Sequence, residues 1–157
     1  MQTFRNVLFV PHGSPTFALN AGAAGAAMSE MVQKLPTPRA IVVVSPHWDT
    51  RIPTVSVATQ LETIHDFYGF PEALYKIQYP ATGCPEVAQE VTTALRNAGM
   101  DVDDSSQHGL DHGAWHTTQG LPQTMTLHGM PNFRQAISRL QSPRMLWSIV
   151  PHSCVTF

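Results

Sequence analysis

Two histidines follow short apolar segments of the chain, at positions where α/β proteins commonly bind ligands. His12 comes two residues after the segment 6–10, and His47 comes two residues after the segment 40–45. If these segments form neighbouring parallel strands, both imidazoles face the crevice beyond the carboxyl ends of the strands. Two imidazoles are half of the donor set of a mononuclear metal site. The alternative is that each ring belongs to a turn and bonds backbone groups.

A loop rich in aromatic residues carries the next candidates. His65 and Asp66 directly precede the sequence FYGFP. Such a loop could close over a planar substrate, and the alternative is a loop packed by its own aromatic rings.

A third candidate is His112, which lies between Asp111 and Gly113. A histidine beside a carboxylate, with a glycine that allows close approach, suits general acid–base chemistry. The alternative is an ordinary Asp-His-Gly turn. Four further histidines have no recognisable strand context and are expected to be surface or structural residues: His108, His116, His128 and His152.

The elements that must position these residues alternate between strand and helix. Apolar or β-branched runs predict strands at 6–10, 40–45, 54–58 and 100–103. Apolar residues at helical spacing predict helices at 18–34 and 85–98, and a short helix is predicted at 72–75. This order predicts an α/β fold with a mainly parallel sheet flanked by helices.

Composition limits the classes of function. The 157 residues are 43% hydrophobic and 13% charged, which favours one folded domain. The formal charge is −2 without a basic cluster, so nucleic acid is not an expected partner. No apolar run has the length of a membrane span or a signal-peptide core, so a cytoplasmic protein is expected. The two cysteines form no CxxC motif.

The last part of the chain has a different composition from the rest. All 11 acidic residues lie at or before Asp111, whereas residues 112–157 contain no Asp, Glu or Lys. The segment also has no sustained apolar period. This change in composition begins directly after Asp111.

Four segments together resemble a known family. They are PHGSP (11–15), AIVVVSPHW (40–48), TIHDFYGFPEALYKIQYPATGCP (63–85) and DHGAW (111–115). In order and spacing they are similar to the 4,5-DOPA dioxygenase-like members of the class III extradiol ring-cleavage dioxygenases. The resemblance covers residues 4–115, and the third segment is long and specific.

The resemblance implies a fold, a cofactor and a reaction. Residues 1–115 would be the N-terminal part of a catalytic domain with one non-haem divalent metal at the carboxyl edge of the strands. The metal would be Fe(II) for catalysis or Zn(II) as bound, with His12 and His47 as ligands. His112 would be the catalytic acid or base, and His65 and Asp66 would bind substrate. The substrates would be a small aromatic diol and O₂.

Residues 116–157 do not resemble the family's continuation, which has a further ligand in a Val-x-His-Asn context. We therefore expect a truncated or frameshifted tail, and a chain that is weakly active or inactive as written. One alternative is a genuine variant tail in which His116, His128 or His152 completes the metal site. Two further alternatives are a non-catalytic metal-binding remnant and a zinc-dependent hydrolase. The physiological catechol, the choice of iron or zinc and the oligomeric state stay open.

Overall fold

The computed structural model describes residues 10, 13–116, 124–129 and 154–156. The predicted strand at 6–10 and the predicted metal ligand His12 therefore lie outside the described residues, apart from Val10, which is in neither helix nor strand. Within the described part of the chain, no helix combines the length and apolar character needed to cross a membrane.

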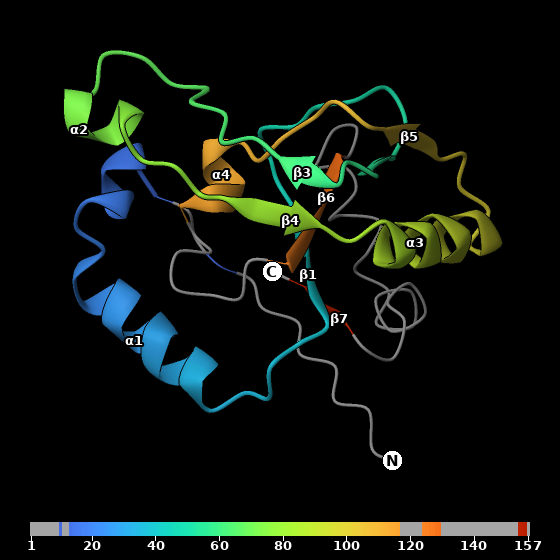
Figure 1. The fold of residues 1–157 in the computed structure, drawn as a ribbon, viewed down its shortest axis with the longest axis horizontal. Coiled ribbons are helices and arrows are strands. Elements are labelled where there is room, and N and C mark those ends of the chain that lie inside the picture. Colours follow the sequence, from blue (N-terminus) through green and yellow to red (C-terminus); the bar gives the residue numbers. More distant parts are fainter. Residues whose placement is uncertain (1–9, 11–12, 117–123, 130–153, 157) are drawn as a thin grey trace.

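The described strands form one sheet that is mainly parallel, as predicted (Figure 1). Four pairings are parallel, namely β1–β6, β1–β7, β4–β6 and β2–β5, whereas β3–β4 and β2–β6 are antiparallel. The strands are β1 (Ala40–Val44), β2 (Thr54–Ser56), β3 (Gln60–Leu61), β4 (Ala81–Gly83), β5 (Asp103–Ser105), β6 (Thr124–Gly129) and β7 (Cys154–Thr156). With the helices described below, the chain has an α/β fold.

Strand β1 is the centre of the core because both of its faces are covered. Ile41 and Val43 belong to one buried cluster, and Ala40 and Val42 belong to the other. Alternate residues of a strand point to opposite faces, so a strand buried on both faces needs a continuous apolar run. The sequence AIVVV meets this requirement, and the predicted strand is confirmed within one residue.

Helix α3 (Pro85–Asn97) covers one of these faces. Its buried residues are Val87, Ala88, Val91, Thr92 and Leu95, and it packs against β2 and β6. Proline occupies the first turn, where its missing N–H costs nothing. Gly99, with a φ of +82°, follows the end of the helix and adopts the left-handed conformation that favours glycine. The predicted helix at 85–98 is therefore confirmed.

The remaining helices are short or lie apart from the sheet. They are η1 (Pro15–Ala18, a 3₁₀ helix), α1 (Gly22–Gln33), α2 (Glu72–Tyr75) and α4 (His112–Trp115). α1 has no buried residue. The helix predicted at 18–34 instead spans Gly22–Gln33. Residues 15–18 form η1, and the φ of +54° at Gly22, the first residue of α1, prevents one continuous helix. The short helix predicted at 72–75 is confirmed.

Two predicted strands differ in extent. The strand expected at 54–58 ends at Ser56. The strand expected at 100–103 instead spans Asp103–Ser105, which is largely exposed and pairs only with β2. The prediction was displaced because it followed the apolar residues Met100 and Val102, whereas an exposed edge strand such as β5 needs no apolar pattern. β6 and β7 lie in the segment expected to be a separate tail, and the boundary after residue 115 stays a prediction.

Candidate metal and acid–base site

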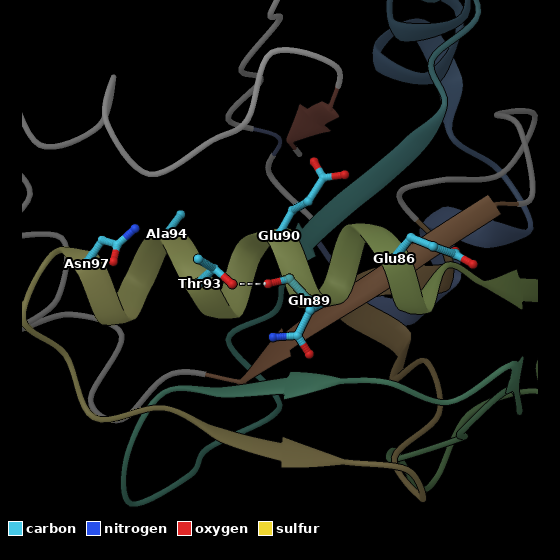
Figure 2. A pocket seen from close by; sticks show the side chains of 6 residues that line it. All are labelled: Glu86, Gln89, Glu90, Thr93, Ala94 and Asn97. Carbon is cyan, nitrogen blue, oxygen red and sulfur yellow. Dashed lines mark hydrogen bonds between the residues drawn. The ribbon is translucent and has the colours of Figure 1, made fainter.

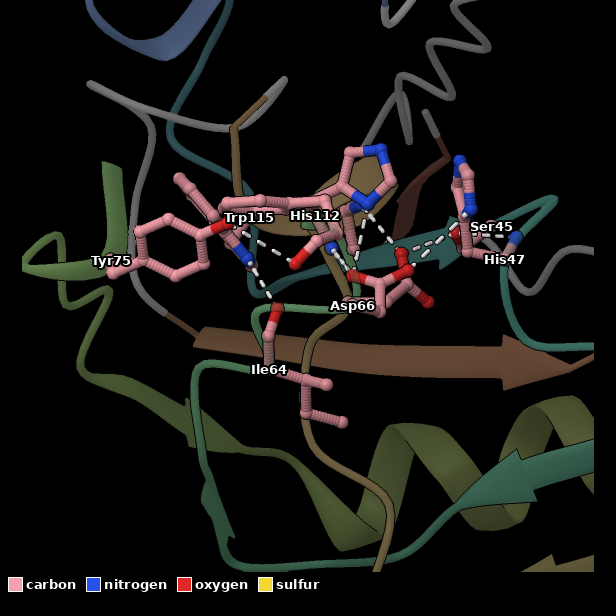
Figure 3. A network of polar contacts seen from close by, with 10 residues as sticks. Ser45, His47, Ile64, Asp66, Tyr75, His112 and Trp115 are labelled. Carbon is pink, nitrogen blue, oxygen red and sulfur yellow. Dashed lines mark hydrogen bonds and ion pairs between the residues drawn. The ribbon is translucent and has the colours of Figure 1, made fainter. Parts of the chain in front are cut away.

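Three candidate side chains from distant parts of the sequence meet near the end of β1 (Figure 3). His47 follows β1 by three residues, Asp66 lies in the loop after β3, and His112 is the first residue of α4. One donor atom from each residue lies within 4.8 Å of the others. This spacing allows the three side chains to act on one small ion or one substrate group.

Asp66 lies between the two imidazoles. Its Oδ1 atom accepts a hydrogen bond from the backbone N–H of His112 at 2.8 Å and lies 2.9 Å from Nδ1 of the same residue. Its Oδ2 atom lies 3.5 Å from Nδ1 of His47. One carboxylate thus contacts both candidate rings.

The surroundings of Asp66 keep its carboxyl group ionised at neutral pH. Burial by itself raises the pKa of Asp66. The hydrogen bonds from the ring and the backbone of His112, together with charge attraction to His112, outweigh burial and lower the pKa to about 2. An ionised carboxylate can only accept hydrogen bonds, so the Nδ1 atom of His112 is the donor in this pair.

The two imidazoles pack directly on each other. The ring centroids of His47 and His112 are 4.0 Å apart, with 49° between the ring planes. Gly113 makes this approach possible, because a Cβ atom there would lie 2.7 Å from Cδ2 of His47 and 2.8 Å from Oγ of Ser45. The close approach expected for this glycine is therefore made to a histidine of the same chain.

A buried hydrogen-bond chain fixes the loop of His47 to α4. Asp111 caps the helix by accepting the N–H of Ala114 at 3.1 Å, and the same Oδ1 atom accepts the hydroxyl of Ser45 at 2.5 Å. The backbone N–H of His47 donates to Oγ of Ser45 at 3.2 Å. Asp111 is 2% exposed, so these bonds are shielded from water. Asp111 therefore ties two segments together, and the carboxylate that contacts the His112 ring is Asp66.

Replacing Gly113 by alanine should disturb this contact. We expect Gly113→Ala to lower the free energy of unfolding by about 1–3 kcal/mol, because the added methyl group overpacks the space beside His47. Urea denaturation measures the change. Gln89→Ala, on the exposed side of α3, is the control and should change the free energy by less than about 0.5 kcal/mol. A Gly113→Ala protein as stable as the control would show that Gly113 does not lie in close contact with His47 and Ser45.

Aromatic side chains pack against the cluster of His47, Asp66 and His112 and beneath α4. The ring of Phe67 stands edge-on to His112, with centroids 5.6 Å apart. Trp115 is fully buried, and its Nε1–H donates to the carbonyl of Ile64 at 2.9 Å. Phe67 also packs on the rings of Phe70 and Tyr75, whereas Tyr68 is 90% exposed. A role of this loop in binding substrate stays a prediction.

The predicted site residues differ in where the structure places them. His47, Asp66 and His112 come together, and His12 lies outside the described residues. Nε2 of His65 lies 3.0 Å from the carbonyl of Ile77, among the rings of the aromatic loop.

The four histidines expected to be surface or structural fall into two groups. His116 is 2% exposed and stacks near His112, and His108 stacks on Trp48 with centroids 4.0 Å apart. Both rings therefore have structural contacts within the fold. His152 lies outside the described residues, and for His128 only its place in β6 is described.

Ser45 and Asp111 are supporting residues that sequence reasoning did not assign to the site. The signal that could have found Ser45 is its place between β1 and His47, where a hydroxyl group can bond the backbone of the turn.

A separate hollow of about 330 Å³ lies on the exposed side of α3 (Figure 2). Its described lining comes from this one helix and contains no histidine: Glu86, Gln89, Glu90, Thr93, Ala94 and Asn97. The hollow has neither the donor set nor the aromatic surroundings of the cluster at His47.

Two imidazoles and one carboxylate within reach of a single ion, beside an α/β sheet, define a candidate mononuclear metal protein. Comparison with known families makes the class specific. Residues 8–117 match the family described as the catalytic LigB subunit of aromatic ring-opening dioxygenase. The match covers more than half of the chain, so the protein belongs to this family, and the resemblance noted from its motifs is confirmed.

Individual relatives agree with the family. The chain is 43% identical over 108 residues to the 4,5-DOPA dioxygenase extradiol of Escherichia coli (strain K12), a match covering 69% of this chain and 40% of the relative. It is 36% identical over 114 residues to the 4,5-DOPA dioxygenase extradiol of Mirabilis jalapa, covering 71% and 43%. The chain thus spans about two fifths of the length of these relatives.

A solved structure agrees with the fold. The crystal structure of an uncharacterized protein from Escherichia coli K12 matches with a TM-score of 0.62 and 25% sequence identity. The match covers 86% of this chain and 51% of that one.

Proposed function

We propose that this chain carries the metal-binding and proton-transferring residues of an extradiol dioxygenase, which opens the ring of a catechol with O₂. The observation that carries the proposal is the convergence of His47, Asp66 and His112 within 4.8 Å in a chain of the LigB family. The names of the relatives support a DOPA-like diol as the substrate class.

The donor types at the cluster fit a divalent metal. Imidazole and carboxylate groups are donor types that non-haem iron and zinc both accept, and the cluster places such groups around one position. Of the three residues in the cluster we assign His47 as a ligand, and the family resemblance implies His12 as a second one. Bound divalent iron would supply the electron transfer between diol and O₂ that an organic side chain cannot provide.

The residues around the metal position have separate roles in the proposal. His112 takes a proton from a hydroxyl group of the diol and returns it later in the reaction. Phe67, which packs edge-on against His112, limits the space beside the acid–base group. The family resemblance implies a place for His65 in the substrate pocket. Its contact with the carbonyl of Ile77 supports a role in holding the loop that carries Asp66.

Oxygen consumption tests the proposal. The chain is loaded with Fe(II) without air and then mixed with L-DOPA and oxygenated buffer. We expect slow oxygen uptake that requires both iron and the diol and falls in His112→Phe, which removes the proton-transferring nitrogens.

The controls separate the competing functions. The metal-free chain and the Zn(II)-loaded chain should consume no oxygen with L-DOPA. Iron binding without oxygen uptake would contradict the proposal and favour a non-catalytic metal-binding protein. Metal-dependent hydrolysis in the absence of oxygen would favour a zinc hydrolase instead.

A further inference from the structure

The carboxylate of Asp66 makes two bonds to the same residue. Oδ1 accepts both the backbone N–H and the ring Nδ1–H of His112, at 2.8 and 2.9 Å. The backbone bond fixes the carboxylate relative to the start of α4, and the ring bond then fixes the rotation of the imidazole. The side chain of His112 is only 6% exposed, which strengthens bonds of this kind.

The bond to Nδ1 determines which ring nitrogen of His112 carries the proton and which carries the lone pair. A neutral imidazole carries one N–H donor and one nitrogen with a free lone pair. With the proton held on Nδ1 by Asp66, the lone pair of His112 is on Nε2. Figure 3 shows the Nδ1 side of this ring facing Asp66.

The neighbouring carboxylate, that of Asp111, bonds other partners. Its Oδ1 atom accepts the hydroxyl of Ser45 and the N–H of Ala114. The carboxylate adjacent in sequence is thus used for capping and loop anchoring, and one that is 46 positions away in the chain orients the ring. Oδ2 of Asp66 also lies 3.5 Å from Nδ1 of His47, so one carboxylate lies beside both imidazoles.

We propose that Asp66 is a positioning residue, which holds His112 as its Nδ1–H tautomer and leaves Nε2 to exchange a proton with the substrate. The proton exchange with a substrate rests on the proposed function, whereas the tautomer of His112 is a property of this chain alone. A carboxylate that orients an imidazole through Nδ1–H is a general device for fixing its tautomer.

Nitrogen NMR of the metal-free chain tests the tautomer directly. Two-bond ¹H–¹⁵N spectra distinguish a protonated from an unprotonated ring nitrogen. In the unaltered protein we expect the His112 ring to show a protonated Nδ1 and an unprotonated Nε2. Asp66→Asn should keep this pattern, because an amide oxygen can accept the same two bonds. Asp66→Ala should produce a mixture of both tautomers.

The experiment includes a control carboxylate and a second variant that removes the acceptor oxygens of Asp66. Asp101→Asn, which alters an exposed carboxylate in the loop before β5, should leave the spectrum of His112 unchanged. Asp66→Leu replaces the alanine variant if that protein does not fold, since it removes both acceptor oxygens but keeps the side-chain volume. With iron and L-DOPA, removal of the carboxylate should lower the rate of oxygen uptake by about 10–100-fold, with partial recovery in Asp66→Asn.

Two results would overturn the inference. One is a His112 ring whose tautomer is the same with and without the carboxylate of Asp66. The other is a loss of metal affinity in Asp66→Asn as large as that in His47→Ala, which would make Asp66 a metal ligand. If the tautomer responds as expected but no variant or parent consumes oxygen, the proposed function fails while the positioning role of Asp66 stands.

Discussion

His47→Ala should abolish tight binding of a divalent metal by this chain. We expect the affinity for Zn(II) or Fe(II) to fall by more than about 100-fold, beyond the range seen when only an outer partner of a ligand is removed. The reason is that an imidazole nitrogen supplies both the bond to the ion and the geometry of the site. Calorimetric titration under anaerobic conditions measures the affinity.

Matched histidine variants show whether the loss is specific to His47. His108→Ala removes a ring that stacks on Trp48 and takes no part in the described metal cluster, so it should leave the affinity unchanged. His112→Ala should have a smaller effect than His47→Ala, because His112 packs against His47 but is assigned to proton transfer. Equal affinity in His47→Ala and the unaltered protein would contradict the assignment of His47 as a ligand.

Trp115→Ala should be the most destabilising substitution in the described part of the chain. We expect the free energy of unfolding to fall by about 3–5 kcal/mol, because the indole is fully buried beneath the site and its removal leaves a large cavity. A loss of this size is a large fraction of the roughly 5–15 kcal/mol that stabilises a typical domain. Guanidinium denaturation followed by circular dichroism measures it.

A second variant separates the volume of the indole from its hydrogen bond. Trp115→Phe keeps most of the apolar volume but leaves the carbonyl of Ile64 without its donor, so we expect a smaller loss of roughly 1–3 kcal/mol. Tyr68→Ala, at a position 90% exposed, is the surface control and should cost less than about 0.5 kcal/mol. A Trp115→Ala protein within about 1 kcal/mol of the parent would mean that the core below α4 is not packed as described.

The elements that sequence reasoning placed well are those whose burial imposes a pattern. Strand β1 needs apolar residues on both faces, and α3 needs them at helical spacing on one face, so both could be predicted. β3 has two residues and β4 three, too short for a period to be visible. The exposed strand β5 has no apolar side to detect.

For the site, too, local sequence identifies the candidate residues, but only the fold shows which of them meet. The residue types marked His47, Asp66 and His112 individually, but their pairing depends on the fold. His65 and Asp66 are adjacent in the sequence, but the fold gives their side chains different partners. In the structure Asp66 contacts His112, and His65 contacts the carbonyl of Ile77.

Paramagnetic NMR with Mn(II) locates the metal most directly, because bound manganese broadens the signals of nearby amides. We predict that substoichiometric Mn(II) first broadens the amides of residues 45–48, 65–67 and 111–114, around the cluster of His47, Asp66 and His112. His47→Ala should remove this selective broadening. Broadening centred instead on the glutamates of α3, or spread evenly over the chain, would contradict the claim that this cluster is a metal centre.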